Sequence, residues 1–365
     1  MKPRTKQILN FVLIFGTFLI VLAIGISDNN LGDTIRALRT MNPGWVALCA
    51  LAFVAFVLCD TLSIMYFLSR QGYRVPLRKV LFTSLAGQYY SNITPGASGG
   101  QPMQIYYLHQ ENVPTGVATS SIVMRFVCYQ LMLSVIGTVL WIIYRPFVAQ
   151  QTGNGQWILI VGYVYNLIMV TLVITLALWK NLVLRLADFG IRLARRWIRH
   201  PEETRERLHR QVESFHGSVM AYRDRPLDFL IQLLIGGLQL MCLMSIVYFI
   251  YRGMNLDEYG YWPVVTMSVM EYLAAAYTPL PGASGAQEGV FSMYFDRIFP
   301  NSMGFAALLL WRFFTYYISI MIGFVAVLVH GMRSGSSIRE TMAIDPDQMK
   351  KDEESEVEAE KAGSD

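Results

Sequence analysis

The sequence has few charged residues and lacks the short motifs that bind nucleotides. Asp, Glu, Lys and Arg make up only 15% of the 365 residues, whereas 54% are hydrophobic and the mean hydropathy is +0.38. Because a soluble domain carries about 25% charged residues, this composition excludes a soluble enzyme and indicates an integral membrane protein. The chain contains no Walker phosphate-binding loop, so ATP-driven pumping by this chain alone is not expected.

Cysteine is scarce and gives no sign of a metal or redox site. The four cysteines lie in apolar stretches without the close pairing of a zinc or redox motif: Cys49, Cys59, Cys128 and Cys242. They are predicted to be small buried hydrophobic residues. His209, Glu213 and His216 have the spacing of metal ligands on one helical face, but a solvated helix produces such triplets freely. The sequence therefore predicts no metal, no cofactor and no disulfide framework.

Long apolar runs are abundant, and six are long enough to cross a membrane. A spanning helix needs about 20 apolar residues, and the six candidates run approximately over residues 8–26, 45–68, 117–144, 157–179, 229–250 and 305–330. Two further apolar segments, around residues 80–111 and 264–299, are interrupted by Pro and Gly. The predicted fold is an all-α polytopic membrane protein with about six transmembrane helices plus two broken re-entrant hairpins; eight full spans are the alternative.

The two broken segments carry the same motif. Residues 95–101 read Pro-Gly-Ala-Ser-Gly-Gly-Gln and residues 281–287 read Pro-Gly-Ala-Ser-Gly-Ala-Gln, so six of seven positions agree. Arg125 follows the first copy at nearly the spacing at which Arg312 follows the second. This order and spacing predict an internal duplication, with repeat halves at about 80–144 and 264–330. Broken segments at matching positions of two halves indicate a transporter binding site.

Basic residues are concentrated in a few regions, which predicts the orientation of the helices. Residues 180–226 contain eleven Lys or Arg against six acidic residues, so this region is expected in the cytoplasm, as an amphipathic helix at the membrane surface. If each broken segment returns to the side it entered, both termini are also cytoplasmic and the two repeats are inverted. Residues 1–332 then form a single transmembrane domain, followed by a disordered polar tail at 333–365.

The two Pro-Gly motifs are the first candidates for a binding site. A break at membrane depth must be buried in protein or line a wet cavity, because its unpaired backbone groups cannot face lipid. Free N–H groups and the neighbouring Ser hydroxyls would suit an anionic headgroup; close helix packing by small residues is the alternative. The predicted binding residues of the motifs are Pro95, Gly96, Ser98, Gly99, Gln101, Pro281, Gly282, Ser284, Gly285 and Gln287.

Two arginines are the next candidates. Arg125 and Arg312 lie about two turns into their spans, where an isolated guanidinium is costly. Their duplication favours a functional role over snorkelling to the interface, because the guanidinium offers a fork of donors matched to phosphate. Asp60, near the end of the second span, is predicted to be interfacial, a helix cap or paired with Arg70.

Two carboxylates near the second break complete the candidate site. A carboxylate at membrane depth, such as Glu271 or Glu288, is a functional candidate because it can bind a cationic amine or carry a proton. Pairing with Arg312 or Arg297 is the alternative interpretation. No residue is predicted to be catalytic.

The motifs resemble those of a known membrane family. Residues 88–96 read Gln-Tyr-Tyr-Ser-Asn-Ile-Thr-Pro-Gly, and residues 278–282 read Thr-Pro-Leu-Pro-Gly. In these stretches, and over about residues 5–332, the chain resembles the flippase-like transmembrane part of lysylphosphatidylglycerol synthase, also called multiple peptide resistance factor. By motif position, the resemblance assigns a role to residues 95–101 with Arg125 and to residues 281–288 with Arg312.

This resemblance implies translocation of a phospholipid, such as lysylphosphatidylglycerol or another anionic or polar lipid, between leaflets of the bacterial cytoplasmic membrane. It also implies a role in resistance to antimicrobial peptides. The bifunctional members continue into a soluble aminoacyltransferase domain, whereas only residues 334–365 follow Arg333 here. We therefore expect no phosphatidylglycerol lysyltransferase activity from this chain alone; the alternative is a membrane subunit or scaffold of such an enzyme. The expected partner is a phospholipid rather than a nucleic acid, and a separate lipid-modifying synthase and a homodimer stay open.

Overall fold

The structure is a computed structural model that describes residues 31–194, 201–222, 225–275, 278–300 and 303–334. The predicted first span at 8–26, both chain termini and the predicted tail after residue 334 lie outside the described residues. The chain divides into two compact units, residues 1–323 and 324–365. Both repeated motifs lie in the first unit, which is described below.

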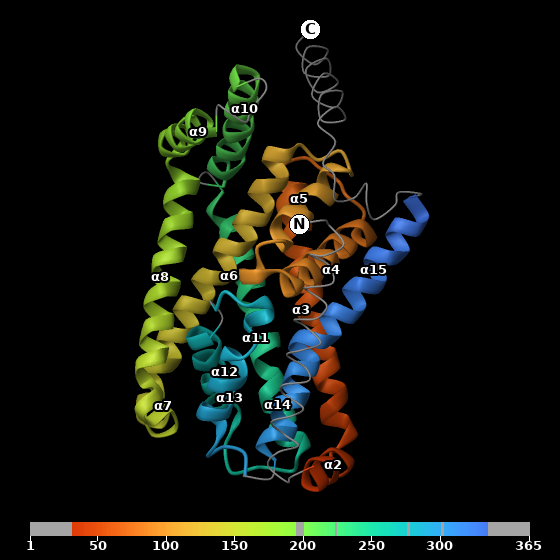
Figure 1. The fold of residues 1–365 in the computed structure, drawn as a ribbon, viewed down its shortest axis with the longest axis vertical. Coiled ribbons are helices and arrows are strands. Elements are labelled where there is room, and N and C mark those ends of the chain that lie inside the picture. Colours follow the sequence, from red (N-terminus) through yellow and green to blue (C-terminus); the bar gives the residue numbers. More distant parts are fainter. Residues whose placement is uncertain (1–30, 195–200, 223–224, 276–277, 301–302, 335–365) are drawn as a thin grey trace. The chain divides into compact units, whose positions relative to one another are not determined.

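Among the described residues, five segments are long and apolar enough to cross a membrane. They are α3 (Pro43–Arg70), α6 (Thr115–Ile143), the α7–α8 segment (Arg145–Leu178), α11 (Pro226–Gly253) and a last segment, Gly304–Met332, that begins with α14 (Figure 1). They match the five predicted spans that fall on described residues. The all-α polytopic membrane fold is therefore confirmed, and no strand occurs in the described ranges.

The remaining helices are shorter. They are α2 (Leu31–Arg39), α4 (Leu77–Ile93), η1 (Pro95–Ala97), α5 (Gly100–His109), η2 (Gly153–Gly155), α9 (Lys180–Ala194), α10 (Pro201–Met220), α12 (Tyr261–Ala275), η3 (Pro281–Ala283) and α13 (Ala286–Phe295). The α7–α8 segment joins α7 (Arg145–Thr152) to α8 (Gln156–Leu178) through η2. The last segment continues from α14 (Gly304–Arg312) through a π-helical turn, η4 (Phe313–Tyr317), into α15 (Ile318–Ser334).

Helices α3 and α11 pack together along their lengths and are joined by buried polar contacts. Pro43 opens α3 behind the N-cap residue Asn42, whose Oδ1 accepts a 2.9 Å hydrogen bond from the Gly44 N–H, as expected for a capped helix start. Further along, Ser63 Oγ donates to Gln232 Oε1 at 2.6 Å and Gln232 Nε2 donates to the Ser63 carbonyl at 2.9 Å. These reciprocal bonds satisfy polar groups that lipid could not.

The first broken segment is a hairpin of two antiparallel helices. Helices α4 and α5 pack against each other, and their glycines show the register. A Cβ at Gly100 would overlap Ser91, and a Cβ at Gly87 would overlap Gln104. Positions 91 with 100 and 87 with 104 are placed symmetrically about the break, so the two helices are antiparallel. This first hairpin therefore has the re-entrant form that the sequence predicts.

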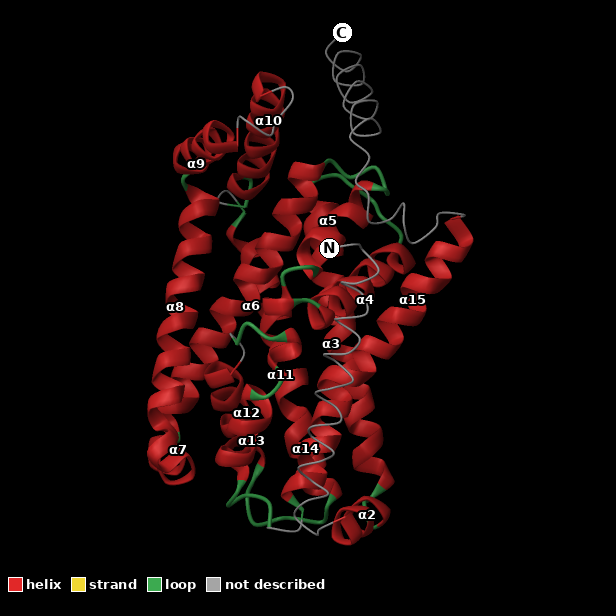
Figure 2. Cartoon of the chain, viewed as in Figure 1, coloured by secondary structure: helices red, strands yellow, loops and turns green. Residues whose placement is uncertain are grey.

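The second hairpin, α12 and α13, approaches the first from the opposite end of the first unit (Figure 1), and the two breaks touch through η1 and η3. Figure 2 shows the breaks as short loop segments between helices. The repeats also exchange contacts, because Gly137 of α6 packs against Leu273 of the second hairpin and Gly323 of α15 packs against Tyr89 of the first. This exchange supports the inverted arrangement.

Helices α9 and α10 form a separate amphipathic pair beside α6 and α8. Arg205 Nε donates to Asp188 Oδ1 at 2.8 Å, and His209 Nε2 lies 2.9 Å from the same oxygen. Arg205 and then His209 hold the pKa of Asp188 below its usual range. Lys180 likewise lowers the pKa of Glu213, 2.8 Å away. The contacts of His209 and Glu213 thus join α9 to α10.

Candidate functional site

A polar chamber of about 310 Å³ lies where the two breaks meet. We call residues 94–99 the first break and residues 278–285 the second break. Seven of the predicted site residues line the chamber: Gly96, Gln101, Arg125, Glu271, Gly282, Gln287 and Arg312. The structure therefore brings residues from both repeats together at one place, as the duplicated motif predicts. The other seven lie nearby but do not line the chamber: Pro95, Ser98, Gly99, Pro281, Ser284, Gly285 and Glu288.

Arg312 holds the second break in place. Its side chain is only 2% exposed. Nε and Nη2 both lie 2.6 Å from Glu288 Oε1, Nη1 donates to Gln287 Oε1 at 2.5 Å, and Nη2 donates to the Gly282 carbonyl at 3.2 Å. The guanidinium also lies 5.0 Å from the centre of the Tyr316 ring. Every one of these hydrogen bonds goes to the second hairpin, and a π-helical turn, a form frequent at functional sites, follows Arg312 directly.

The second break also satisfies its own polar groups. Glu288 Oε2 accepts a 2.6 Å hydrogen bond from the Gly285 N–H, and Ser284 Oγ donates to the Pro281 carbonyl at 2.9 Å. From the sequence, the N–H and Ser hydroxyl groups of this break were expected to be free for a headgroup. That expectation is wrong for the Gly285 N–H and the Ser284 hydroxyl, because both donate to acceptors within the second hairpin. The alternative that pairs Glu288 with Arg312 is confirmed.

Arg125 is held by a different set of partners. Its Nη1 forms an ion pair with Asp60 of α3, and its Nη2 donates to Gln104 Oε1 at 3.2 Å. Its Nε has no hydrogen-bond partner among the described residues, and the side chain is 15% exposed. Gln239 Nε2 donates to Asp60 Oδ1 at 3.1 Å. Arg125 is therefore anchored mainly to α3, rather than to the motif of its own repeat.

Asp60 is the residue that the sequence interpretation missed. It was predicted to be interfacial, a helix cap or paired with Arg70, but it is fully buried and pairs with Arg125. Ten residues of α-helix separate Asp60 from Arg70 by about 15 Å, so the two cannot meet. Arg70 Nε instead donates to Asp228 Oδ2 at 2.7 Å. The sequence does contain a signal for Asp60. A buried arginine requires an acidic partner, and the first motif has Pro102 where the second has Glu288, so the acid that pairs with Arg125 must come from elsewhere in the chain.

Glu271 lines the chamber, and one of its two carboxyl oxygens has no hydrogen-bond partner among the described residues. It is 1% exposed, and its Oε1 makes no hydrogen bond to any described residue. Arg312, which was a candidate partner, is occupied by Glu288, and Arg297 Nη1 donates to the Gln150 carbonyl at 2.9 Å. A buried polar group without a partner is costly. Among the described residues that line the chamber, Glu271 is thus the acidic one, and its Oε1 is unpaired.

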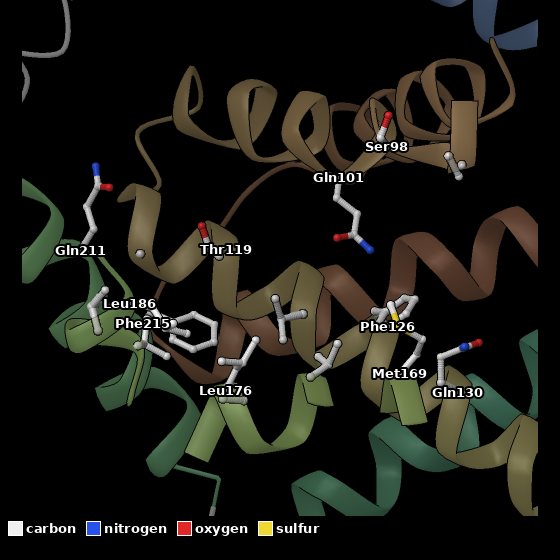
Figure 3. A pocket seen from close by; sticks show the side chains of 18 of the residues that line it. Ser98, Gln101, Thr119, Phe126, Gln130, Met169, Leu176, Leu186, Gln211 and Phe215 are labelled. Carbon is white, nitrogen blue, oxygen red and sulfur yellow. The ribbon is translucent and has the colours of Figure 1, made fainter. Parts of the chain in front are cut away.

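A second, apolar pocket of about 910 Å³ adjoins the chamber (Figure 3). Its walls come from both breaks and from α5, α6, α8, α9, α10 and α12. Ser98 lines this pocket rather than the chamber. The two spaces share the following lining residues: Gly96, Ala97, Gln101, Phe126, Gln130, Tyr272 and Thr278. A charged cavity therefore continues into a much larger apolar one.

Sequence comparisons find relatives of similar length. The chain is 21% identical over 332 residues to the UPF0104 membrane protein MJ1595 of Methanocaldococcus jannaschii, covering 87% of this chain and 94% of the relative. It is 19% identical over 341 residues to the uncharacterized protein MG306 homolog of Mycoplasma pneumoniae, covering 86% of each. A UPF0104 membrane protein of Archaeoglobus fulgidus is 22% identical over 261 residues, which are 70% of this chain and 77% of the relative.

The family match covers both hairpins and the helices that carry the two arginines. It is to the transmembrane region of lysylphosphatidylglycerol synthase and extends over residues 7–323. This range includes every residue that lines the chamber and the apolar pocket. The chain therefore belongs to the family of the lysylphosphatidylglycerol synthase transmembrane region.

Proposed function

We propose that this protein moves a polar lipid with an anionic headgroup between the leaflets of a bacterial cytoplasmic membrane. The supporting observation is that two broken hairpins, approaching from opposite ends, meet at a chamber lined by Arg125 and Arg312. Inverted broken helices that meet near the middle of a membrane are how many transporters offer one site to both sides in turn.

The chamber offers complementary groups for a phosphate and for an amine. Arg125 Nε has no partner and can donate to a phosphate oxygen while Nη1 keeps its ion pair with Asp60. Glu271, whose Oε1 has no hydrogen-bond partner among the described residues, lines the same chamber and would accept a hydrogen bond from an ammonium group. Lysylphosphatidylglycerol, the lipid in the family's name, carries both groups and is the first substrate to test.

The chamber reduces the main barrier to translocation, which is the transfer of a charged headgroup into hydrocarbon. Even on the mild insertion scale, one charged side chain at the bilayer centre costs about 2.5–3.5 kcal/mol. Charged and amide groups from Arg125, Glu271 and Gln287 line the chamber and replace part of the water that the headgroup loses. The lipid can then cross without placing its headgroup in the acyl chains of the bilayer.

The same proposal places α9 and α10 at the cytoplasmic surface. The exposed, charged α10 residue Glu206 provides a test. A cysteine at this position should react with a membrane-permeant maleimide in intact cells and stay protected from an impermeant one. Ready labelling by the impermeant reagent would contradict this orientation.

Translocation by the purified protein tests the proposed function. We expect vesicles containing wild-type protein to expose a fluorescent lysylphosphatidylglycerol to an external quencher at least tenfold faster than protein-free vesicles. Arg125→Ala should remove most of this gain, whereas Arg70→Ala, which breaks an ion pair outside the chamber, should keep it. Absence of translocation by a folded wild-type protein would contradict the proposal and favour a scaffold for a separate lipid-modifying enzyme.

A further inference from the structure

The apolar pocket is lined by uncharged residues and shares part of its lining with the chamber. None of the described residues that line it is charged, whereas the chamber is lined by two arginines and Glu271. Its volume of about 910 Å³ is near the upper limit of small-molecule sites, which run from roughly 300 to 1,000 Å³. The chamber alone, at about 310 Å³, has room for a headgroup but for little more.

The length of the pocket matches one leaflet of a bilayer. On α6 its lining extends from Gly116 to Gln130 and on α8 from Tyr165 to Ala177. At 1.5 Å per residue, these stretches measure about 21 Å and 18 Å. Half of a hydrocarbon core is about 15 Å. The pocket is therefore long enough to accommodate an extended acyl chain over the depth of a leaflet.

The two ends of the pocket differ in their lining. Gln101 and Gln130 lie at the chamber end, whereas Leu186 and Phe215, with Gln211 as a polar neighbour, lie at the end formed by α9 and α10 (Figure 3). Near Phe215 the walls consist mainly of aliphatic side chains: Leu176, Ala177, Val183, Leu208 and Val212. A lipid bound to both spaces would be oriented by this difference, with its headgroup at the breaks and its chain end at α9 and α10.

We infer that the apolar pocket is an acyl-chain site that holds the lipid in a turned-over intermediate. This inference rests on the proposed function. With the lipid headgroup at the breaks, its acyl chain points towards α9 and α10. Lipids in the bilayer leaflet on that side have the opposite orientation, with the headgroup at the surface and the acyl chains towards the bilayer centre. The protein thus provides a site for an acyl chain as well as for the headgroup, instead of leaving both chains in the bilayer.

Photocrosslinking tests both the position of the acyl-chain site and the direction in which the acyl chain lies in it. Two phosphatidylglycerol probes would carry a diazirine, one at the terminal acyl carbon and one close to the glycerol. After irradiation of the full-length protein in nanodiscs, we expect the terminal probe to label Leu186 and Phe215, and the other probe to label Phe126 and Met169. The reverse pattern, or labelling confined to lipid-facing positions such as Ile168, would overturn the inference.

A matched pair of variants on α8 provides the control. Val173 lines the pocket, whereas its neighbour Leu172 does not line it and is 48% exposed. Val173→Trp should reduce the labelling of Leu186 and Phe215 at least fivefold, and Leu172→Trp should leave it unchanged. Because crosslinking does not need transport, pocket labelling without translocation would contradict the proposed function alone. Translocation without pocket labelling would contradict only the acyl-chain site.

Discussion

The two breaks have almost the same sequence but are packed very differently. In both, a Gly-Ala pair adopts left-handed backbone angles, with φ of 60° and 54° at Gly96 and Ala97 and of 58° and 49° at Gly282 and Ala283. Residues 95–98 of the first break are nevertheless exposed, whereas Ala283 in the second is buried. The backbone conformation therefore belongs to the motif, and the surroundings decide how firmly it is held.

The difference originates in the acid that pairs with each arginine. Glu288 belongs to the second hairpin, so its ion pair with Arg312 ties that hairpin to α14. Asp60 belongs to α3, and among the described hydrogen bonds the first hairpin is attached to Arg125 through Gln104 alone. We therefore expect the first break to move during transport and the second to act as the fixed side of the chamber.

The largest expected effect is on stability, from removing Arg312. Arg312→Ala leaves the buried Glu288 carboxylate without its partner, a change that typically destabilises by about 3–5 kcal/mol. Thermal unfolding in detergent would show this as a large fall in the midpoint temperature. The double variant Arg312→Ala with Glu288→Gln should recover part of the loss. Equal effects of both variants would contradict the role of the ion pair.

Matched glycine substitutions separate packing from backbone strain. Alanine at position 96 or 282 must adopt the same left-handed angles, at about 1–2 kcal/mol each. A Cβ at 96 meets no other atom within 4 Å, whereas one at 282 overlaps the Tyr316 ring, which typically adds about 1–3 kcal/mol. Gly282→Ala should thus lower the unfolding temperature more than Gly96→Ala. In a Tyr316→Ala background this difference should disappear, and its persistence would contradict the packing argument.

Cysteine labelling compares the accessibility of the two breaks without a large change in the stability of the protein. In a background lacking the four native cysteines, Ala97→Cys should react with a small maleimide several-fold faster than Ala283→Cys, because Ala97 is exposed and Ala283 is 7% exposed. A saturating lipid substrate should slow the reaction at position 97. Equal rates at the two positions would remove the distinction between a mobile and a fixed break.

The smallest expected effect concerns α9 and α10, which flank the apolar pocket. The pKa of Asp188 is lowered by Arg205 and His209, so its contribution to docking is complete above the unfolded-state pKa of about 3.9. This contribution of Asp188 to the packing of α9 against α10 is lost as the pH falls through the lower folded-state pKa of Asp188. Above about pH 7, where an ordinary histidine imidazole is mainly neutral, hydrogen exchange in α9 should be independent of pH after correction for intrinsic rates. Asp188→Asn should weaken protection over that whole range, and unchanged protection would exclude this contact.

The sequence was sufficient to predict the fold class, the described spans and the meeting of the two motifs. It could not predict how each break is packed, because positions 95–99 and 281–285 are identical. It missed the Asp60 partner of Arg125, since that acid comes from a helix outside the repeat. The apolar pocket was also unforeseen, because its walls join α6 to the α8–α10 region through tertiary packing.

The most direct test of the account is to join the two breaks covalently. Ala97 and Leu280 both border the chamber, and Ala97→Cys with Leu280→Cys can be linked by a flexible bis-maleimide in a background lacking the native cysteines. If the headgroup passes between the breaks, linking should abolish translocation in vesicles, while each single-cysteine protein treated with the same reagent stays active. Undiminished translocation by the fully linked protein would contradict the central claim that the lipid headgroup crosses the membrane between the two breaks.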